Sequence, residues 1–116
     1  MLGLVSGIIV YNAVLEKSHT EIDAYTLALE DAILEKNTKE ADRNLTKIEE
    51  KWGKTRNMMM VFLNHSDLVN IEEKIGNMRS ALTFSDFFEM YKECSSFKTF
   101  FKYAVSGANP SLINIL

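Results

Sequence analysis

The sequence predicts an all-α fold, either an antiparallel four-helix bundle or stacked helical hairpins, with a long first helix. Apolar residues recur at alternating steps of three and four, which is the spacing of one helix face. The chain of 116 residues contains one proline and five glycines, so long stretches are free of helix-breaking residues. Short polar segments separate four such stretches, and short connections favour antiparallel neighbours.

The first predicted helix begins inside the uncharged segment 1–15 and ends near Lys36. Asn37 then predicts a new helix start, because its side chain can cap the free N–H groups while Glu40 occupies the third helical position. The apolar stripe of the first helix consists of Ile22, Tyr25, Leu29, Ala32 and Ile33.

The second predicted helix runs from Thr38 to Leu63 along a regular heptad seam. Asn64 is expected to end it in a left-handed conformation, and Ser66 or Asp67 is expected to cap the third helix. The seam of the second helix contains Ala41, Leu45, Ile48, Trp52, Thr55, Met59 and Phe62. The apolar face of the third helix contains Leu68, Ile71, Ile75, Met78 and Leu82.

The fourth predicted helix opens with the cap Thr83-x-x-Asp86 and ends at Ser106-Gly107, after which Pro110 prevents its resumption. Its broad apolar face contains Phe87, Met90, Tyr91, Cys94, Phe97 and Phe101. The chain therefore divides into an apolar leader (1–15), a helical domain (16–106) and an apolar C-terminal tail (107–116).

The uncharged leader leaves three interpretations open. A membrane-spanning helix needs about 20 apolar residues and at least about 17, so fifteen residues are few for a complete anchor. The leader is the end of an anchor that starts upstream, a short or tilted anchor, or the apolar end of a helix buried in a bundle or between subunits. No basic residue precedes it and no cleavage site is evident, which disfavours a signal peptide.

Composition argues against several functions. The net charge of −3 lacks the basic footprint of a nucleic-acid-binding protein. A single cysteine, Cys94, cannot form an internal disulfide, and no cluster of Cys and His suggests zinc. No phosphate loop, nucleophile elbow or paired acid cluster occurs. We therefore predict no catalytic, cofactor-binding or metal-binding residue, no small-molecule substrate and no enzymatic activity.

Two local patterns have a chemical and a structural interpretation. Glu16-x-x-His19 has the spacing of half a di-iron carboxylate site, but the second pair is missing, so a solvated helix face is favoured. His65 with Asp67 and Cys94 could form an acid–base or nucleophilic set. The structural interpretation is favoured here too: His65 bonds the last carbonyl groups of a helix, and Cys94 is a buried, inert thiol.

Apolar side chains expected outside the core predict a protein partner, self-association or a membrane contact. The run of methionines near residue 59 lies beside the leader if the first two helices form a hairpin, and flexible thioethers adapt to such a junction. The alternative is a wide core face with a few partly exposed rings. The candidate surface contains Met58, Met60, Phe100, Tyr103 and Ile113.

Several motifs together define a resemblance: the apolar N-terminal segment, Leu63-x-His65, Leu68-x-x-Ile71, and the ending Asn114-Ile115-Leu116. With the second-helix seam up to Trp52, they resemble the domain of unknown function 4363 family from spore-forming Firmicutes. The resemblance implies a membrane-anchored helical domain without an assigned activity. It implies a bacterial cell-membrane location with the domain outside the cytoplasm; a cytoplasmic location is the alternative. Trp52, His65 and Asn114 are the family-like structural positions.

Two functions follow as expectations. The first is a non-enzymatic, membrane-tethered helical interaction or structural module. The second is a tetratricopeptide-like domain, in which a concave groove between hairpins would hold an extended peptide.

Overall fold

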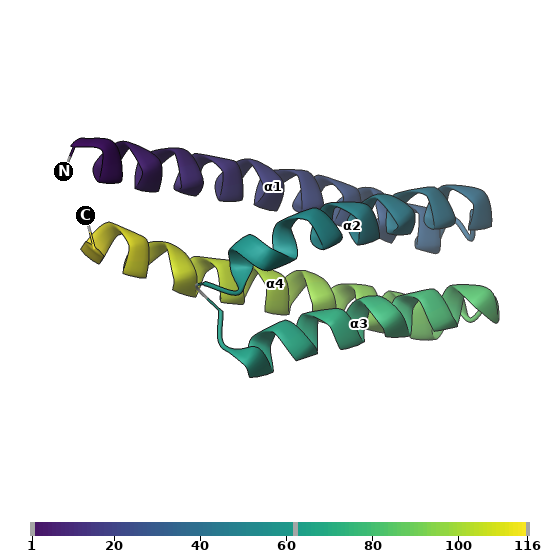
Figure 1. Ribbon diagram of the computed structural model, residues 1–116. Helices are drawn as coiled ribbons and strands as arrows, with labels where there is room; N and C mark the ends of the chain where they lie inside the picture. Colours follow the sequence, from purple (N-terminus) through teal and green to yellow (C-terminus); the bar gives the residue numbers. More distant parts are fainter. Residues whose placement is uncertain (1, 62, 116) are drawn as a thin grey trace.

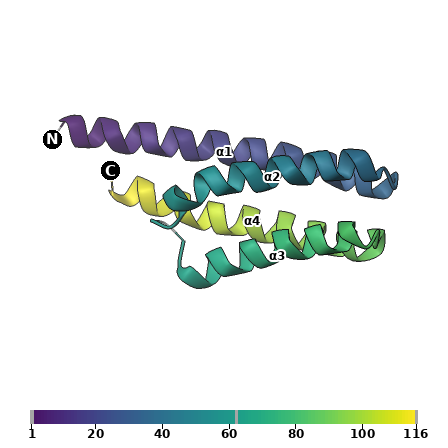
Figure 2. The same ribbon diagram turned by 45° about the vertical axis from the view of Figure 1, so that its right-hand side comes forward.

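The chain forms four α-helices in the computed structural model, which describes residues 2–61 and 63–115, with side chains for 13–61 and 63–104. The helices are α1 (Leu2–Leu34), α2 (Thr38–Met59), α3 (His65–Thr83) and α4 (Phe87–Ile115), and the described residues contain no strand. They run antiparallel in chain order and form an elongated molecule of 53 × 23 × 18 Å (Figures 1 and 2). The all-α prediction is confirmed.

The four helices close into a ring around one core. Helix α1 packs against α2 and α4, and α3 packs against the same two helices. The pairs α1–α3 and α2–α4 are diagonals without comparable backbone contact in the described residues. This is the arrangement of a four-helix bundle, not of hairpins stacked in a row.

Most predicted core positions are buried. The described seam residues of α2 and the whole apolar face of α3 are confirmed, while Phe62 lies outside the described residues. The prediction for Tyr91 is wrong, because the inward stripe of α4 passes through Met90, Cys94, Phe97 and Phe101 and leaves Tyr91 38% exposed. The rings of Phe87, Phe88 and Phe100 beside this stripe are partly buried or exposed, and Tyr25 of the predicted α1 stripe is only partly buried.

The turn between α1 and α2 combines a helix end with the next helix start. Lys36 adopts a left-handed conformation with φ of 56°, and its N–H donates to the Ile33 carbonyl. The N–H of Asn37 donates to the Ala32 carbonyl, which completes a Schellman motif. The Asn37 side chain accepts a hydrogen bond from the Glu40 N–H at 3.2 Å, so the predicted cap is confirmed.

The turn between α3 and α4 has the same construction. Ser85 is left-handed with φ of 54°, and the N–H groups of Ser85 and Asp86 donate to Leu82 and Ala81. Asp86 caps α4 by accepting from the Glu89 N–H at 3.1 Å. The predicted cap at Thr83 is wrong, because this residue is still helical and its hydroxyl donates to a carbonyl of its own helix.

The connection between α2 and α3 corrects four predictions: the end of α2, the left-handed Asn64, the α3 cap at Ser66 or Asp67, and the place of His65 at the end of α2. Helix α2 ends at Met59, four residues earlier than predicted. Asn64 is not left-handed: with φ of −74° and ψ of 164° it caps α3, accepting from the Asp67 N–H at 2.8 Å. His65 is therefore the first residue of α3 and does not terminate α2. The Asn64 side chain accepts a hydrogen bond from an N–H group in the first turn of α3 that has no partner within the helix. This bond favours Asn64 as the cap of α3 over Asn64 as a left-handed end of α2.

Helix α4 extends to Ile115, so its predicted end at Ser106-Gly107 is wrong. Glycine and proline each lower helix propensity by a few kcal/mol at most, and proline removes only one backbone N–H donor. The predicted tail 107–116 is thus helical as far as residue 115.

The two hairpins repeat one burial pattern. Ten buried positions of α1 and α2 each match a buried position exactly one hairpin later, 49 residues along the chain. The pairs in α1 and α3 are Ile22/Ile71, Thr26/Ile75, Leu29/Met78, Ala32/Ala81 and Ile33/Leu82. The pairs in α2 and α4 are Ala41/Met90, Leu45/Cys94, Ile48/Phe97, Trp52/Phe101 and Thr55/Ala104. Sequence identity does not reveal this repeat, because only two of the ten pairs, Ile22/Ile71 and Ala32/Ala81, have the same residue type.

Candidate functional site

Three uncharged segments that are distant in sequence meet at one end of the bundle. Residues 1–15, 57–66 and 103–116 contain no Asp, Glu, Lys or Arg. Figures 1 and 2 show the start of α1, the α2–α3 connection and the end of α4 at the same end of the molecule, with both hairpin turns at the other. We call these three segments the uncharged end. All 13 basic and 16 acidic residues lie outside it.

Several described side chains of the uncharged end are exposed to solvent. Val61 is 72% exposed and Tyr103 is 77% exposed, and Val14 and Met60 are also exposed. Leu15, Met59 and Leu63 are buried beneath them and connect this end to the core. Contiguous exposed apolar surface marks interaction sites, and these four exposed side chains are the candidates for such a surface at this end.

The predicted partner or membrane surface is only partly exposed. Met60 and Tyr103 are exposed, whereas Met58 and Phe100 pack partly buried against the core. The Lys74 ammonium group lies 6.0 Å from the centre of the Phe100 ring and covers it. Ile113 lies outside the residues whose side chains are described, as does Asn114.

No helix in the described part of the chain is both long and apolar enough to cross a membrane.

An aromatic cluster lies in the core near the uncharged end. The Phe101 ring stacks on Phe97 at 5.4 Å between centroids and meets Trp52 edge-on at 6.3 Å. His19 packs against the same Phe101 ring at 5.2 Å, so its predicted place on a solvated face is wrong. The helix turns this ring inward because position 19 lies three residues before the buried Ile22.

Two buried nitrogen atoms of this cluster have no hydrogen-bond partner among the described residues: Nε2 of His19 and Nε1 of Trp52. The nearest charge to the imidazole is the Asp23 carboxylate, 3.6 Å from Nε2. Such unpaired groups cost about 1–3 kcal/mol each. Trp52 also lines a shallow groove between α2 and α3, together with Arg56, Glu72 and Gly76.

The residues considered for catalysis are not brought together. His65 is exposed at the start of α3, whereas Cys94 is fully buried and its thiol lies 3.9 Å from the Thr26 carbonyl oxygen. Burial raises the pKa of the Cys94 thiol to about 12, so it is protonated and unreactive at neutral pH. Glu16 is exposed, and the described residues contain no group of three metal-ligating side chains.

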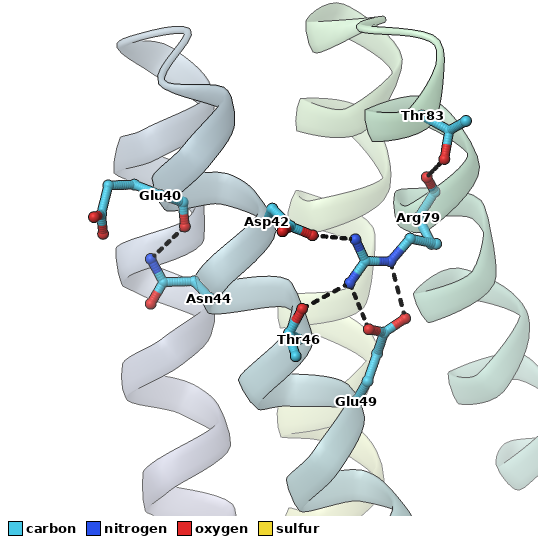
Figure 3. A network of polar contacts seen from close by, with 7 residues as sticks. All are labelled: Glu40, Asp42, Asn44, Thr46, Glu49, Arg79 and Thr83. Atoms are coloured by element: carbon cyan, nitrogen blue, oxygen red, sulfur yellow. Dashed lines mark hydrogen bonds and ion pairs between the residues drawn. The ribbon is translucent and has the colours of Figure 1, made fainter.

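A polar network ties α3 to α2 on the far half of the bundle (Figure 3). The Arg79 guanidinium donates two hydrogen bonds to the Glu49 carboxylate, at 2.5 and 3.2 Å. It also donates to Asp42 at 2.5 Å and to the Thr46 hydroxyl at 3.0 Å. These partners raise the pKa of Arg79 above its usual value, chiefly through the bond to Glu49. The arrangement holds two helices together.

One comparison with known proteins gives a match. The sequence model described as Domain of unknown function (DUF4363) matches residues 9–115. The chain belongs to the DUF4363 family. No match was found among curated proteins or among solved structures.

Membership of the DUF4363 family confirms the resemblance inferred from the helical and terminal motifs. It assigns no activity to any residue, since the family is described only as a domain of unknown function. Within this DUF4363 chain, sequence reasoning missed the inward position of His19 and the Arg79 network. The sequence does contain a signal for the uncharged end: residues 57–66 lack charged side chains, as do the segments at both termini.

Proposed function

We propose that this DUF4363 protein is a non-enzymatic helical module that attaches to a membrane through its uncharged end and presents the charged bundle to a protein partner. The observation that carries the proposal is the meeting of three uncharged segments at one end of the molecule. An uncharged segment at one terminus has many explanations, but three uncharged segments at one end of the molecule form an uncharged surface.

The physical support comes from desolvation. Removing apolar surface from water stabilises by about 25 cal/mol per Å². The backbone of residues 2–15 and 103–115 is helical, so its polar groups are already hydrogen-bonded and can enter an apolar layer at low cost. Charged side chains would oppose entry strongly, and this end has none.

The length of the apolar segments sets the depth of attachment. At 1.5 Å per residue, the helix from Leu2 to Leu15 rises roughly 20 Å. The hydrocarbon layer of a bilayer is about 30 Å thick. The described segment therefore suits insertion to part of that depth, with the bundle outside the hydrocarbon layer.

The closed ring of helices favours this module over the tetratricopeptide-like alternative. A peptide-binding repeat needs an open concave surface between stacked hairpins. Here α1 packs against α4, which brings the two hairpins face to face around one core.

Flotation of the full chain with lipid vesicles in a density gradient tests the proposal. The unmodified protein is expected to float with vesicles and to sediment or remain below without them. Val61→Glu places a charge on the uncharged end and is expected to reduce flotation at least tenfold. Phe84→Glu is the matched control, because Phe84 is also highly exposed, at 83% against 72% for Val61, and lies in the α3–α4 turn at the opposite end.

Failure of the unmodified protein to float would contradict the membrane attachment. Equal loss of flotation in both variants would contradict the role of the uncharged end. Light scattering of the same samples without vesicles separates membrane attachment from self-association, which would instead give a defined oligomer.

A further inference from the structure

We infer that the membrane recognised by this protein is anionic, and that exposed lysines next to the uncharged end bind the negatively charged headgroups of that membrane. The inference rests on the proposed membrane attachment and adds the lipid class. The border is defined as the six residues of each helix next to the uncharged end: 16–21, 51–56, 67–72 and 97–102.

Charge is distributed unevenly along the bundle. The border contains six basic and four acidic residues, whereas the rest of the chain contains seven basic and twelve acidic residues. A protein with a net charge of −3 therefore has a positive border and a negative far half. An anionic surface would attract the first and repel the second, which orients the molecule with its uncharged end toward the lipid.

Three of the six basic residues are already paired. Lys51 pairs with Glu21, Arg56 pairs with Glu72, and Lys98 lies 3.0 Å from the Glu30 carboxylate. These pairs join α2 to α1, α2 to α3 and α4 to α1. Their charges are largely used within the bundle.

The other three, Lys17, Lys54 and Lys102, are exposed and have no ion pair or hydrogen bond within the described residues. They lie on α1, α2 and α4. We call them the lysine belt. Because none of them makes an ion pair or hydrogen bond within the described residues, their ammonium groups are available to phosphate groups outside the bundle.

The belt lies at one level along the bundle. In the α1–α2 hairpin, which turns at Asn37, Lys17 and Lys54 differ in level by about three residues, or roughly 5 Å. By the hairpin repeat, Lys102 on α4 corresponds to the position just before Lys54, a difference of roughly 1.5 Å. The pKa of Glu21 is lowered, mainly by the hydrogen bond from Lys51, and the charges of Lys17 and Lys54 lower it further.

Lysine at this position suits a lipid headgroup. Its flexible stem lets the ammonium group reach the headgroup layer while the stem lies along apolar surface. Each lysine near an anionic bilayer contributes about fivefold to partitioning, and the effect fades beyond a Debye length of about 10 Å. Tyr103 follows Lys102 directly and is exposed, which matches the preference of tyrosine for the interface between headgroups and hydrocarbon.

Partitioning of the full chain onto two kinds of vesicle tests the inference: phosphatidylcholine alone, and phosphatidylcholine mixed with phosphatidylserine. We expect at least tenfold stronger partitioning onto the anionic vesicles at low salt. The combined variant Lys17→Gln, Lys54→Gln, Lys102→Gln is expected to lose this preference while it still binds neutral vesicles as the unmodified protein does.

The matched control removes three exposed lysines from the far half: Lys36→Gln, Lys39→Gln, Lys92→Gln. It has the same net charge as the belt variant and is expected to keep or increase the preference for anionic vesicles. Inorganic phosphate at the concentration of the lipid phosphate is expected not to displace the protein. Displacement by free phosphate would show an ion site instead of a membrane surface and overturn the inference.

The outcomes separate this inference from the proposed function. Equal binding to neutral and anionic vesicles overturns the lipid preference and leaves the membrane attachment standing. Equal effects of the two triple variants overturn the role of the belt. Absence of binding to every vesicle overturns the membrane attachment itself, and the inference with it.

Discussion

Arg79 shows how a single side chain orders two helices of this bundle. Its planar guanidinium reaches from α3 to three residues of α2 and pairs with Glu49 through two parallel hydrogen bonds. Bidentate pairs of this kind hold a fixed geometry that lysine cannot reproduce. The side chain is about one-third exposed, so solvent screens the attraction and its contribution to stability is modest.

Replacement of Arg79 tests this contribution. Arg79→Ala is expected to lower the free energy of unfolding by about 1 kcal/mol, because several partly screened hydrogen bonds are lost together. Arg43→Ala is the control, since Arg43 is 72% exposed and makes one ion pair of 3.7 Å with Glu40. It is expected to change stability by less than about 0.5 kcal/mol in urea unfolding. Equal effects would show that the network contributes nothing beyond an ordinary surface pair.

Cys94 provides a second test at the scale of one residue. Burial raises its pKa to about 12, whereas an unfolded thiol titrates near 8.5. The folded state thus favours the protonated thiol: its contribution to stability is fully present below about pH 8.5 and is lost as the pH rises toward 12. At pH 8 we expect the native protein to react with a disulfide reagent roughly 10³-fold more slowly than the urea-unfolded protein. Similar rates would contradict a buried thiol.

At the scale of the element, the two hairpin turns use one design. In each, a left-handed residue ends the first helix, and the next residue both completes the Schellman motif and caps the second helix. Neither left-handed residue is glycine: they are Lys36 and Ser85. A residue with a Cβ atom is strained in this conformation by roughly 1 kcal/mol.

The turns therefore predict stabilising glycine substitutions. Lys36→Gly and Ser85→Gly are each expected to raise the free energy of unfolding by about 0.5–1 kcal/mol. Lys47→Gly, at an exposed position inside α2, is expected to lower it by about 1 kcal/mol. Thermal unfolding followed by circular dichroism measures all three. Destabilisation by Lys36→Gly would show that the lysine side chain does more at this turn than occupy a left-handed position.

At the scale of the whole molecule, the bundle consists of two equivalent hairpins that pack face to face. Their equivalence is in burial and turn geometry, not in residue type: Ala41 corresponds to Met90, and Leu45 to Cys94. At these two pairs a small side chain in one hairpin corresponds to a larger one in the other, which lets facing side chains interdigitate in a common core. The connection between the hairpins, residues 60–64, is longer than the hairpin turns, and Met60 and Val61 in it are exposed.

Insertions distinguish the two kinds of connection. Two glycines inserted between Met60 and Val61 are expected to cost less than about 1 kcal/mol, because loop-closure entropy grows slowly with length. The same insertion between Lys36 and Asn37 separates the Schellman motif from the α2 cap and is expected to cost about 2 kcal/mol. Urea unfolding of both variants measures the difference. An equal cost would contradict the hairpin as the structural unit.

The sequence by itself determined the helical class, the four elements and nearly all of the core, because helix periodicity places apolar residues on one face whatever that face packs against. It also determined the family and the cap at Asn37, which depends on three neighbouring residues. Capping at Thr83, termination at Asn64 and the end of α4 were wrong, because competing local signals differ by about 1–3 kcal/mol and tertiary contacts choose between them.

Only the tertiary structure decided which distant segments share a surface. Periodicity gives the face of a helix but not its neighbour, so the contact of His19 with Phe101, the reach of Arg79 and the match of the two hairpins could not be read from spacing. The uncharged end is the clearest case: each of its three segments is visible in the sequence, but antiparallel packing alone brings them to one end. Four antiparallel helices place both termini and the central connection at the same end, so three uncharged segments of the sequence form one surface.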